Sequence, residues 1–595
     1  MKNVVEYTGN ALWIKITVIT KRQLQCGEER YFIMIRLFEN HRIRKARELD
    51  GVWNFINEAS GKSYRLPVPG CWEQHPDMLT YTGKGEFTRA VYTDKNCNLR
   101  FEFKGVSHTA DVYFDGVKIA HHYNAFTPFS AIVKGVEKGE HELKVYVDNS
   151  FGEASALHIP NDYYTYGGIT RPVAMELVPD TYIKYVHFTP SVKEGKWSAE
   201  IEVAVCNISD EDKEIELYGR VEDVADSGMY KRLVVEKNSF KTVVFDREFC
   251  SVKPWSDKSP NLYNLAFVIK ADGEETDDLI ERVGFRMVEV KGKNIYLNGE
   301  RVRLKGFNRH EDYAVDGCAV SMNHIVHDIE LMQEMGVNAL RTCHYPNDER
   351  MLDLCDERGI MVWEENHARG LTLEQMKNPN FEKQCADCID EMIENHYNHP
   401  SIVIWGIMNE CASETPEGRE MYKKQFEQIR GLDKTRPLSF ASCKHLNDIC
   451  LDLVDIVSYN IYTGWYSSED IKTRKDRLIE WIRTAGGADK PFMVTEFGAA
   501  AIYGYRDRSL CRWSEDYQAQ LLDETLDVYM ADDDISAVFV WQFADCRITD
   551  GKGIDEFTRW QTRARCHNNK GVVDEYRRPK LSFDVIKKKF ETNWI

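Results

Sequence analysis

The sequence predicts three folded domains, each with its own architecture. A jelly-roll-like β-sandwich is expected at residues 41–180, an immunoglobulin-like β-sandwich at 181–288 and a (β/α)8 TIM barrel at 289–595. Two observations support this order. Short strands that alternate with period two fill the first half, whereas buried apolar strands alternate with helical patterns in the second half. The length of 595 residues suits three or four domains.

The first 40 residues fit this plan poorly. They are too polar, and too often interrupted by lysine, for the apolar core of a secretory signal. Met34 precedes a segment that reads like a natural beginning, which makes it an alternative start of translation. We therefore expect residues 1–40 to form an N-terminal extension of uncertain order.

The first sandwich is predicted from alternating strands such as those at 98–104, 110–115 and 141–147. Near its end lies a different kind of segment, at residues 161–171, with three tyrosines, two glycines and an aspartate. This composition is typical of an ordered functional loop. The alternative is a loop that only packs against a neighbouring domain.

The second sandwich is predicted from alternating strands at 197–205 and 264–270, with turns such as 271–273 between strands. About 100 residues with strands every ten or so are typical of an immunoglobulin-like fold. Its loops contain no cluster of titratable residues, so we expect a structural role.

The barrel is predicted from eight buried strands separated by helical patterns, as in the helix between Ser321 and Gly336. Eight strands in about 305 residues fit a (β/α)8 barrel with modest insertions. The expected strands are 304–308, 339–342, 361–364, 402–409, 438–442, 456–460, 492–495 and 537–541.

Two of these strands end in a carboxylate. The apolar run from Ile402 leads to Asn409 and Glu410, and the run from Phe492 leads to Glu496. If both strands belong to one parallel barrel, both acids emerge at its C-terminal face. Two carboxyl groups that face one pocket are the machinery of glycoside hydrolysis. The alternative is a pair of acids that only cap the following helices.

Other strand ends carry polar and aromatic side chains. His310 follows the first strand, His344 the second, Tyr462 and Tyr466 the sixth, and Trp541 the eighth. A single histidine is more often structural than functional. Several strand ends of this kind together are typical of a sugar-binding site.

Composition restricts the partners. The net charge of −19 argues against nucleic acid or an anionic membrane, although a pocket can carry a local field of the opposite sign. No run of 18 apolar residues is present. Sixteen cysteines without regular spacing favour a reducing cytoplasm, and Cys385 and Cys388 are expected to be two thiols on one helix rather than a metal site.

Four segments resemble glycoside hydrolase family 2: 306–312, 341–346, 405–410 and 494–498. The predicted order of domains agrees with that family. The resemblance implies that Glu410 is the acid/base, Glu496 the nucleophile and Asn409 the residue that contacts the sugar 2-hydroxyl.

The segment 568–571 resembles the Asn-x-Lys motif of the β-glucuronidases in this family. The resemblance implies that Asn568 and Lys570 bind the C6 carboxylate of the sugar, which suits a directed donor and a positive charge. Asp162 matches the position at which these enzymes reach from the first sandwich into the barrel mouth. Tyr462, Tyr466 and Trp541 match their substrate contacts.

Two departures from the β-glucuronidase pattern are visible. The family has an arginine a few residues before the motif, and neither Arg563 nor Arg565 stands at that offset. Arg565 is included among the candidate substrate contacts. The segment 366–380 is short, so the long loop that covers small aglycones in many bacterial relatives is expected to be missing.

The resulting expectation is a retaining, cytoplasmic β-glucuronidase that acts on small or oligosaccharide glucuronides, as a homo-oligomer such as a dimer or tetramer. A β-galacturonidase, a β-galactosidase and a non-catalytic carbohydrate-binding protein are the alternatives. We expect no metal and no cofactor required for catalysis. The bound flavin (FMN) of some bacterial relatives is not readable from this sequence.

Overall fold

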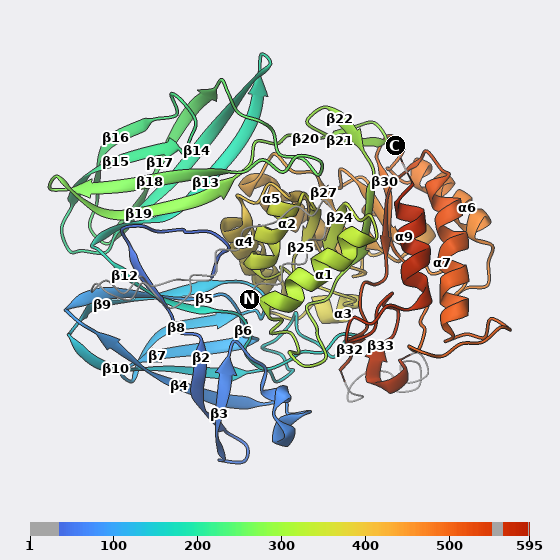
Figure 1. Ribbon diagram of the computed structural model, residues 1–595, viewed down its shortest axis with the longest axis horizontal. Helices are drawn as coiled ribbons and strands as arrows, with labels where there is room; N and C mark the ends of the chain where they lie inside the picture. The colour runs from blue at the N-terminus through green and yellow to red at the C-terminus, as the bar shows by residue number, and fades with distance from the viewer. Residues whose placement is uncertain (1–34, 550–562, 593, 595) are drawn as a thin grey trace, which may run out of the picture.

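The computed structural model describes residues 35–549, 563–592 and 594 (Figure 1). Residues 1–34 of the expected extension lie outside this range. Residues 35–40 pack against the body of the protein, because Ile35 is buried and Arg36 forms an ion pair of 2.9 Å with Asp353 of the barrel.

The first sandwich consists of two antiparallel sheets, drawn in blue in Figure 1. Alternate residues of its strands point inward, as Leu143, Val145 and Val147 do, and pack around Trp53 and Phe55. One sheet has the order β1 (Lys45–Glu48), β12 (Val173–Val178), β5 (Cys97–Phe103) and β9 (Phe129–Val136). The other has the order β3 (Ser63–Val68), β2 (Gly51–Asn57), β4 (Lys84–Thr93), β10 (Gly139–Asp148), β7 (Thr109–Phe114) and β8 (Val117–Tyr123), and β6 (Val106–Ser107) pairs with β11 (Gly168–Ile169).

The second sandwich, drawn in green, packs two smaller antiparallel sheets around Ile201, Leu217 and Phe267. One sheet contains β13 (Thr181–Lys193), β14 (Lys196–Asn207) and β17 (Ser239–Phe249). The other contains β16 (Met229–Val235), β15 (Lys213–Val221), β18 (Tyr263–Ala271) and β19 (Glu274–Val283). A meander of β20 (Val288–Lys291), β21 (Asn294–Leu297) and β22 (Glu300–Val302) then packs against the first residues of the barrel strands.

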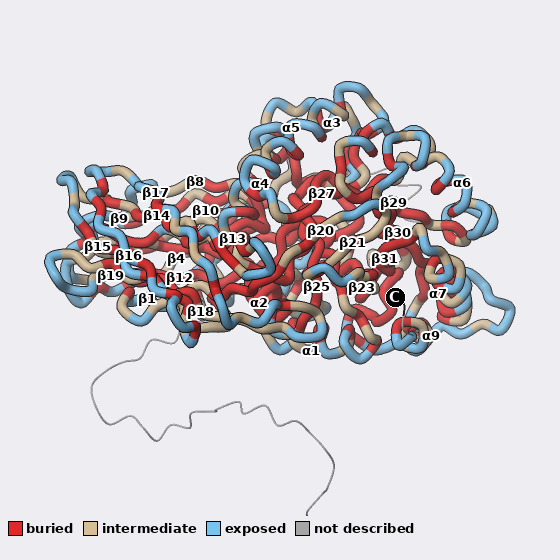
Figure 2. Tube along the Cα trace, turned by 90° about the horizontal axis from the view of Figure 1, so that it is seen from above, coloured by how far each residue is buried: buried red, intermediate tan, exposed pale blue. Residues whose placement is uncertain are grey.

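The last domain is the predicted TIM barrel, and its buried interior appears red in Figure 2. Its parallel sheet contains β23 (Leu304–Asn308), β24 (Ala339–Thr342), β25 (Met361–Glu365), β26 (Ile402–Gly406), β27 (Leu438–Ser439), β28 (Ala441–Ser442), β29 (Val457–Asn460), β30 (Phe492–Phe497) and β31 (Ile535–Val540). β27 and β28 are the two halves of the fifth strand and form the two ends of the sheet order. The eight predicted strands are therefore all present in the sheet.

Helices surround this sheet on its outer side (Figures 1 and 2). They are α1 (Met322–Glu334), α2 (Glu349–Arg358), α3 (Leu373–Met376), α4 (Phe381–His396), α5 (Pro416–Leu432), α6 (Ile471–Thr484), α7 (Glu515–Met530) and α9 (Leu581–Phe590). A short ribbon of β32 (Cys546–Arg547) and β33 (His567–Asn568) lies beyond β31. No helix within the described residues has the length and apolar character needed to cross a membrane.

The tyrosine-rich loop of the first sandwich reaches the barrel. The Tyr163 hydroxyl lies 3.0 Å from His367 Nε2, and the Tyr166 hydroxyl donates to Asp312 at 2.9 Å. Asp162, the residue before Tyr163, lines a pocket together with barrel residues. The loop therefore contributes a side chain to the pocket and does more than fill the domain interface.

Candidate active site

The pocket lies at the C-terminal ends of the barrel strands and has a volume of about 280 Å³. It brings together residues that are far apart in the chain, including Glu410 after β26 and Glu496 at the end of β30. Seven of the predicted site residues line it: Asp162, Glu410, Tyr462, Tyr466, Glu496, Trp541 and Lys570.

Glu410 is positioned by a sharp change in the backbone after β26. Gly406 ends this strand, and a Cβ atom there would collide with Trp363. Met408 and Glu410 then adopt left-handed φ values of 38° and 55°, which are uncommon for residues with a side chain. The Glu410 amide donates to the carbonyl of Ala441 at 2.9 Å, which ties the acid to the end of β28.

Glu496 is held by two donors at the floor of the pocket. Arg341 Nη1 donates to Glu496 Oε1 at 3.0 Å, and the Tyr462 hydroxyl donates to Oε2 at 2.8 Å. Burial and the charge of nearby Glu410 raise the pKa of Glu496 to about 8, although Arg341 and Tyr462 oppose this shift. Because the two carboxyl groups interact, this titration belongs to the pair, which holds one proton at neutral pH.

The contacts favour the negative charge on Glu496. Glu410 accepts a neutral hydrogen bond from Asn460 Nδ2 at 2.9 Å, and Arg369 Nη2 lies 3.7 Å from its carboxylate. Glu496 has the closer ion pair, with Arg341, and the phenol hydrogen bond as well. The ion pair with Arg341 and the phenol hydrogen bond therefore stabilise the charged form of Glu496.

Arg341 also orients the neighbouring amide. Its Nη2 donates to Asn409 Oδ1 at 2.8 Å and to Glu365 Oε1 at 2.9 Å. The guanidinium is fully buried and lies over the ring of Trp363. Asn409 is therefore fixed beside the carboxylate pair by a side chain that cannot lose its charge.

A second group of charges in the pocket surrounds the Tyr466 hydroxyl. Lys570 Nζ donates to the Tyr466 hydroxyl at 3.0 Å, and Arg563 Nη1 donates to the same oxygen at 3.3 Å. The desolvation of its hydroxyl raises the pKa of Tyr466, but the charges of Lys570 and Arg563 outweigh this effect and lower it to about 8. Asn568 is buried beside them and donates to Asp162 Oδ2 at 3.4 Å.

Lys570 is a buried cation. Only 1% of its surface is exposed, and burial together with the charge of Arg563 lowers the pKa of its ammonium group. The rings of Tyr462, Trp465 and Tyr466 surround it at 5.1 to 5.8 Å. Within the described residues Lys570 forms no salt bridge, whereas Arg563 pairs with Asp162 at 2.8 Å.

Arg565 does not reach the pocket. Its backbone is left-handed, with a φ of 61°, and its guanidinium pairs with Glu575 at 2.8 Å. Arg563 occupies the pocket wall in its place. A further arginine, Arg369, was missed by the sequence analysis, although it lies 3.0 Å from Asp162 and extends toward Glu410. It belongs to the short segment after β25, where no local pattern indicates a site.

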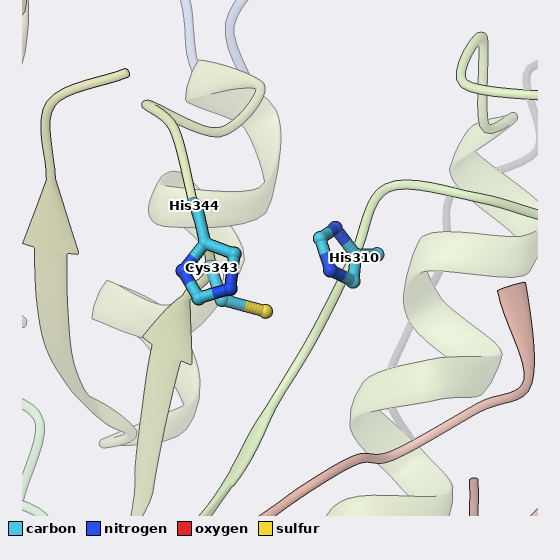
Figure 3. Close-up of side chains that lie close together, drawn as sticks. All are labelled: His310, Cys343 and His344. Atoms are coloured by element: carbon cyan, nitrogen blue, oxygen red, sulfur yellow. The ribbon is translucent and has the colours of Figure 1, made fainter. Parts of the chain in front are cut away.

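His310, His344 and Cys343 lie close together (Figure 3), and none of the three is among the residues that line the pocket. His344 packs on Trp541 with a centroid distance of 5.1 Å, and its Nδ1 lies 2.8 Å from Glu365. Burial lowers the pKa of both imidazoles. Their Nε2 atoms lack a hydrogen-bond partner in the part of the chain that is described.

These three side chains are the donors that could hold a metal ion beside the pocket. Their ligand atoms lie within 4.8 Å of one another, and two imidazoles with a thiolate form a set that zinc can use. The same Nε2 atoms are equally suited to sugar hydroxyls, because His344 Nε2 lies 3.8 Å from Glu496.

Comparison with known proteins agrees with this geometry. A model described as "Glycosyl hydrolases family 2, TIM barrel domain" matches residues 288–593, and one described as "Glycosyl hydrolases family 2" matches residues 181–286. A crystal structure of a family 2 β-galacturonidase from Eisenbergiella tayi, bound to galacturonate, is 46% identical, with a TM-score of 0.91. The alignment covers 94% of this chain and all of that one.

β-Glucuronidases are more distant relatives. The β-D-glucuronidase structure from Dictyoglomus thermophilum is 25% identical, with a TM-score of 0.79, over 93% of this chain and 98% of that one. The β-glucuronidase of Streptococcus agalactiae is 25% identical over 93% of this chain and 96% of its own length.

Proposed function

Because this chain belongs to glycoside hydrolase family 2, we propose that it is a retaining β-uronidase, which removes a terminal β-linked uronic acid. The observation that supports this proposal most directly is the buried Lys570, which has no salt bridge among the described residues. A buried charge without a partner costs folding free energy. A substrate carboxylate at C6 supplies that partner.

The reaction proceeds in two displacements. In the first, a Glu496 oxygen attacks the anomeric carbon, the glycosidic bond breaks, and Glu410 gives its proton to the leaving oxygen. In the second, Glu410 takes a proton from water, the resulting hydroxide attacks the anomeric carbon, and Glu496 is released as a carboxylate. Arg341 and Tyr462 hold Glu496 for attack through the contacts at 3.0 and 2.8 Å. Asn409, fixed by Arg341, meets the 2-hydroxyl.

The side chains around Lys570 bind the sugar carboxylate. Lys570 supplies the charge, Asn568 adds a directed donor, and Arg563 and Tyr466 complete the wall. Charge-assisted hydrogen bonds of this kind are stronger than neutral ones. A neutral hexoside leaves Lys570 without a partner, which disfavours β-galactosidase activity. A non-catalytic binding protein does not require two coupled carboxyl groups, which disfavours that alternative as well.

The configuration at C4 separates two candidate substrates. The 46% identity to a β-galacturonidase over nearly the full chain favours β-galacturonides. The Asn-x-Lys segment and the curated β-glucuronidases at about 25% identity favour β-glucuronides, the substrate expected from the sequence. Since the β-galacturonidase has the higher identity, over 94% of this chain, we place the galacturonide first and the glucuronide second.

A panel of 4-nitrophenyl β-D-galacturonide, glucuronide and galactoside tests this proposal. We expect the highest kcat/KM for a uronide, and NMR spectroscopy should detect the β-anomer of the sugar as the first product. Preference for the galactoside would contradict the uronidase proposal, and the α-anomer as first product would contradict the two-step mechanism.

Two further expectations remain proposals. All fifteen cysteines of the described residues are free thiols, which supports a cytoplasmic location. A homo-oligomeric state is also proposed, and size-exclusion chromatography with light scattering would test it.

A further inference from the structure

We infer that the rim of the pocket beside Glu410 is a binding site for an acidic leaving group, with His445 and Arg474 as its recognition residues. This inference rests on the proposed function, because it extends the substrate from a terminal uronic acid to the group attached to it. The leaving group it specifies carries a carboxylate near the scissile bond, as a second acidic sugar does.

The position of this rim follows from the chemistry. The general acid must reach the glycosidic oxygen, so the leaving group lies on the Glu410 side of the sugar ring. The Glu410 amide donates to the carbonyl of Ala441 at 2.9 Å, so the chain that follows β28 runs beside the acid. Cys443 and His445 belong to this chain, and both line the pocket. Lys570 belongs to the segment after β33.

His445 is presented to the pocket by an unusual backbone. Its φ of 45° is left-handed, and its carbonyl accepts a hydrogen bond from the Tyr459 hydroxyl at 2.9 Å. Nδ1 of the ring is buried without a hydrogen-bond partner among the described residues. Strained conformations that persist in folded proteins cluster at binding sites. A ligand hydroxyl at this position would satisfy the buried nitrogen.

Arg474 supplies the charge. It lies in the first turn of α6, lines the pocket, and has 17% of its side chain exposed. Glu469 is its carboxylate neighbour, at 3.6 Å, but Glu469 is closer to Arg477, at 3.0 Å. Two arginines therefore share one carboxylate.

The other titratable side chains next to His445 and Arg474 add no net charge to the rim. Lys444 pairs with Glu414 at 3.2 Å. Burial, with the charges of Arg474 and Arg477, lowers the pKa of His445 to about 4, so its imidazole is neutral near pH 7. The surplus positive charge is thus one arginine, which can pair with a carboxylate in a bidentate manner. A neutral leaving group gains nothing from this charge.

Two aryl uronides with matched chemistry test the site. One carries 4-cresol and the other 4-hydroxyphenylacetate as the leaving group. The two phenols are similar, and only the second has a carboxylate. We expect the parent enzyme to have a kcat/KM roughly tenfold higher for the anionic substrate at low salt, as one partly exposed charge pair allows. We expect Arg474→Gln to remove most of this preference and 0.5 M NaCl to weaken it.

Arg477→Gln is the matched control, because Arg477 pairs with the same carboxylate but does not line the pocket. It should retain the preference for the anionic substrate. The ratio within one protein does not depend on how much of that protein is folded. His445→Ala should lower kcat/KM for a uronic acid disaccharide several-fold more than for the cresyl uronide.

Equal kcat/KM for the two aryl uronides in the parent would overturn the inference. An equal loss of preference in Arg474→Gln and Arg477→Gln would also overturn it, since a general positive field would then account for the effect. Failure of the uronidase proposal has a different signature, namely hydrolysis of cresyl galactoside in preference to either cresyl uronide. The same pair of leaving groups would then be compared on the galactoside.

Discussion

Replacing Lys570 by methionine tests the recognition of the sugar carboxylate. Methionine is close to lysine in length and has no charge, so the buried site stays filled while the ammonium is removed. The parent site holds this ammonium with 1% exposure, 3.0 Å from the Tyr466 hydroxyl and without a salt bridge in the described residues. The substrate carboxylate is therefore its expected partner in the bound state.

The size of the effect follows from this burial. Removing one member of a buried, hydrogen-bonded charge pair costs about 2–5 kcal/mol. Arg563 remains beside the substrate carboxylate and compensates part of the loss, so we expect the lower half of that range, about 2–3 kcal/mol. This corresponds to a fall of roughly 30- to 150-fold in kcat/KM, since each 1.4 kcal/mol is about tenfold.

The assay compares an aryl β-uronide with its methyl ester, which has the same ring and no negative charge. We expect the uronide-to-ester ratio of kcat/KM to fall in Lys570→Met, whereas the ester alone should change little. Lys580→Met is the control: Lys580 is equally buried but pairs with Asp545 at 2.8 Å, outside the pocket lining. A parallel decline for both substrates in Lys570→Met, as expected for Lys580→Met, would refute the assigned role.

Four further outcomes are expected. Glu496→Ala should abolish turnover, and azide should restore it with an inverted glycosyl azide as product, whereas near-normal activity in the folded variant would exclude Glu496 as nucleophile. Glu410→Gln should slow glycosylation far more for poor leaving groups than for nitrophenols, and an equal effect on both would exclude it as the acid. The kcat/KM of the parent should fall as the pH rises through about 8, where the coupled pair loses its shared proton. In Glu410→Gln the pKa of Glu496 should be lower than in the parent, and the pH dependence of the rate at which a 2-fluoro glycosyl fluoride labels the enzyme would measure this. Asp328→Asn should lower the free energy of unfolding, measured in urea, by about 3–5 kcal/mol, because two buried arginines lose their partner. The control is Asp476→Asn, which removes an exposed ion pair and should lower the same free energy by less than about 1 kcal/mol.

The barrel strands could be predicted because a buried parallel strand has a simple pattern. The predicted first and second strands, 304–308 and 339–342, agree with β23 and β24 at every residue. The fourth strand was predicted to end at Asn409 but ends at Gly406. The apolar run continues through Met408, yet the backbone there is left-handed so that Glu410 can face the pocket. An apolar sequence pattern predicts that the residues are buried, but it does not predict a left-handed turn of the backbone.

The acids and the Asn-x-Lys segment were visible in the sequence because each stands at a fixed position after a strand or within a short motif. The contacts of Asp162 were not visible. Its partners Arg369 and Arg563 are 207 and 401 residues away in the chain and meet only when the first sandwich docks on the barrel. Neither Arg563 nor Arg565 stands at the family's offset, so the spacing could not decide between them; the left-handed backbone at Arg565 turns it toward Glu575.

The charges around the pocket bear on how a protein with a net charge of −19 would bind the acidic sugar of the proposed function. Among the described residues, five cations and four carboxyl groups belong to the pocket or to the ion pairs behind it: Arg341, Arg369, Arg474, Arg563 and Lys570, with Asp162, Glu365, Glu410 and Glu496. Burial raises the pKa of Glu496 to about 8, so near pH 7 one carboxyl group of the pair is protonated. This protonation lowers the negative charge of the pocket, which favours the binding of a uronate. In the proposed mechanism the same proton is the one that Glu410 gives to the leaving group, so the protonation state proposed to bind the uronate is also the reactive one.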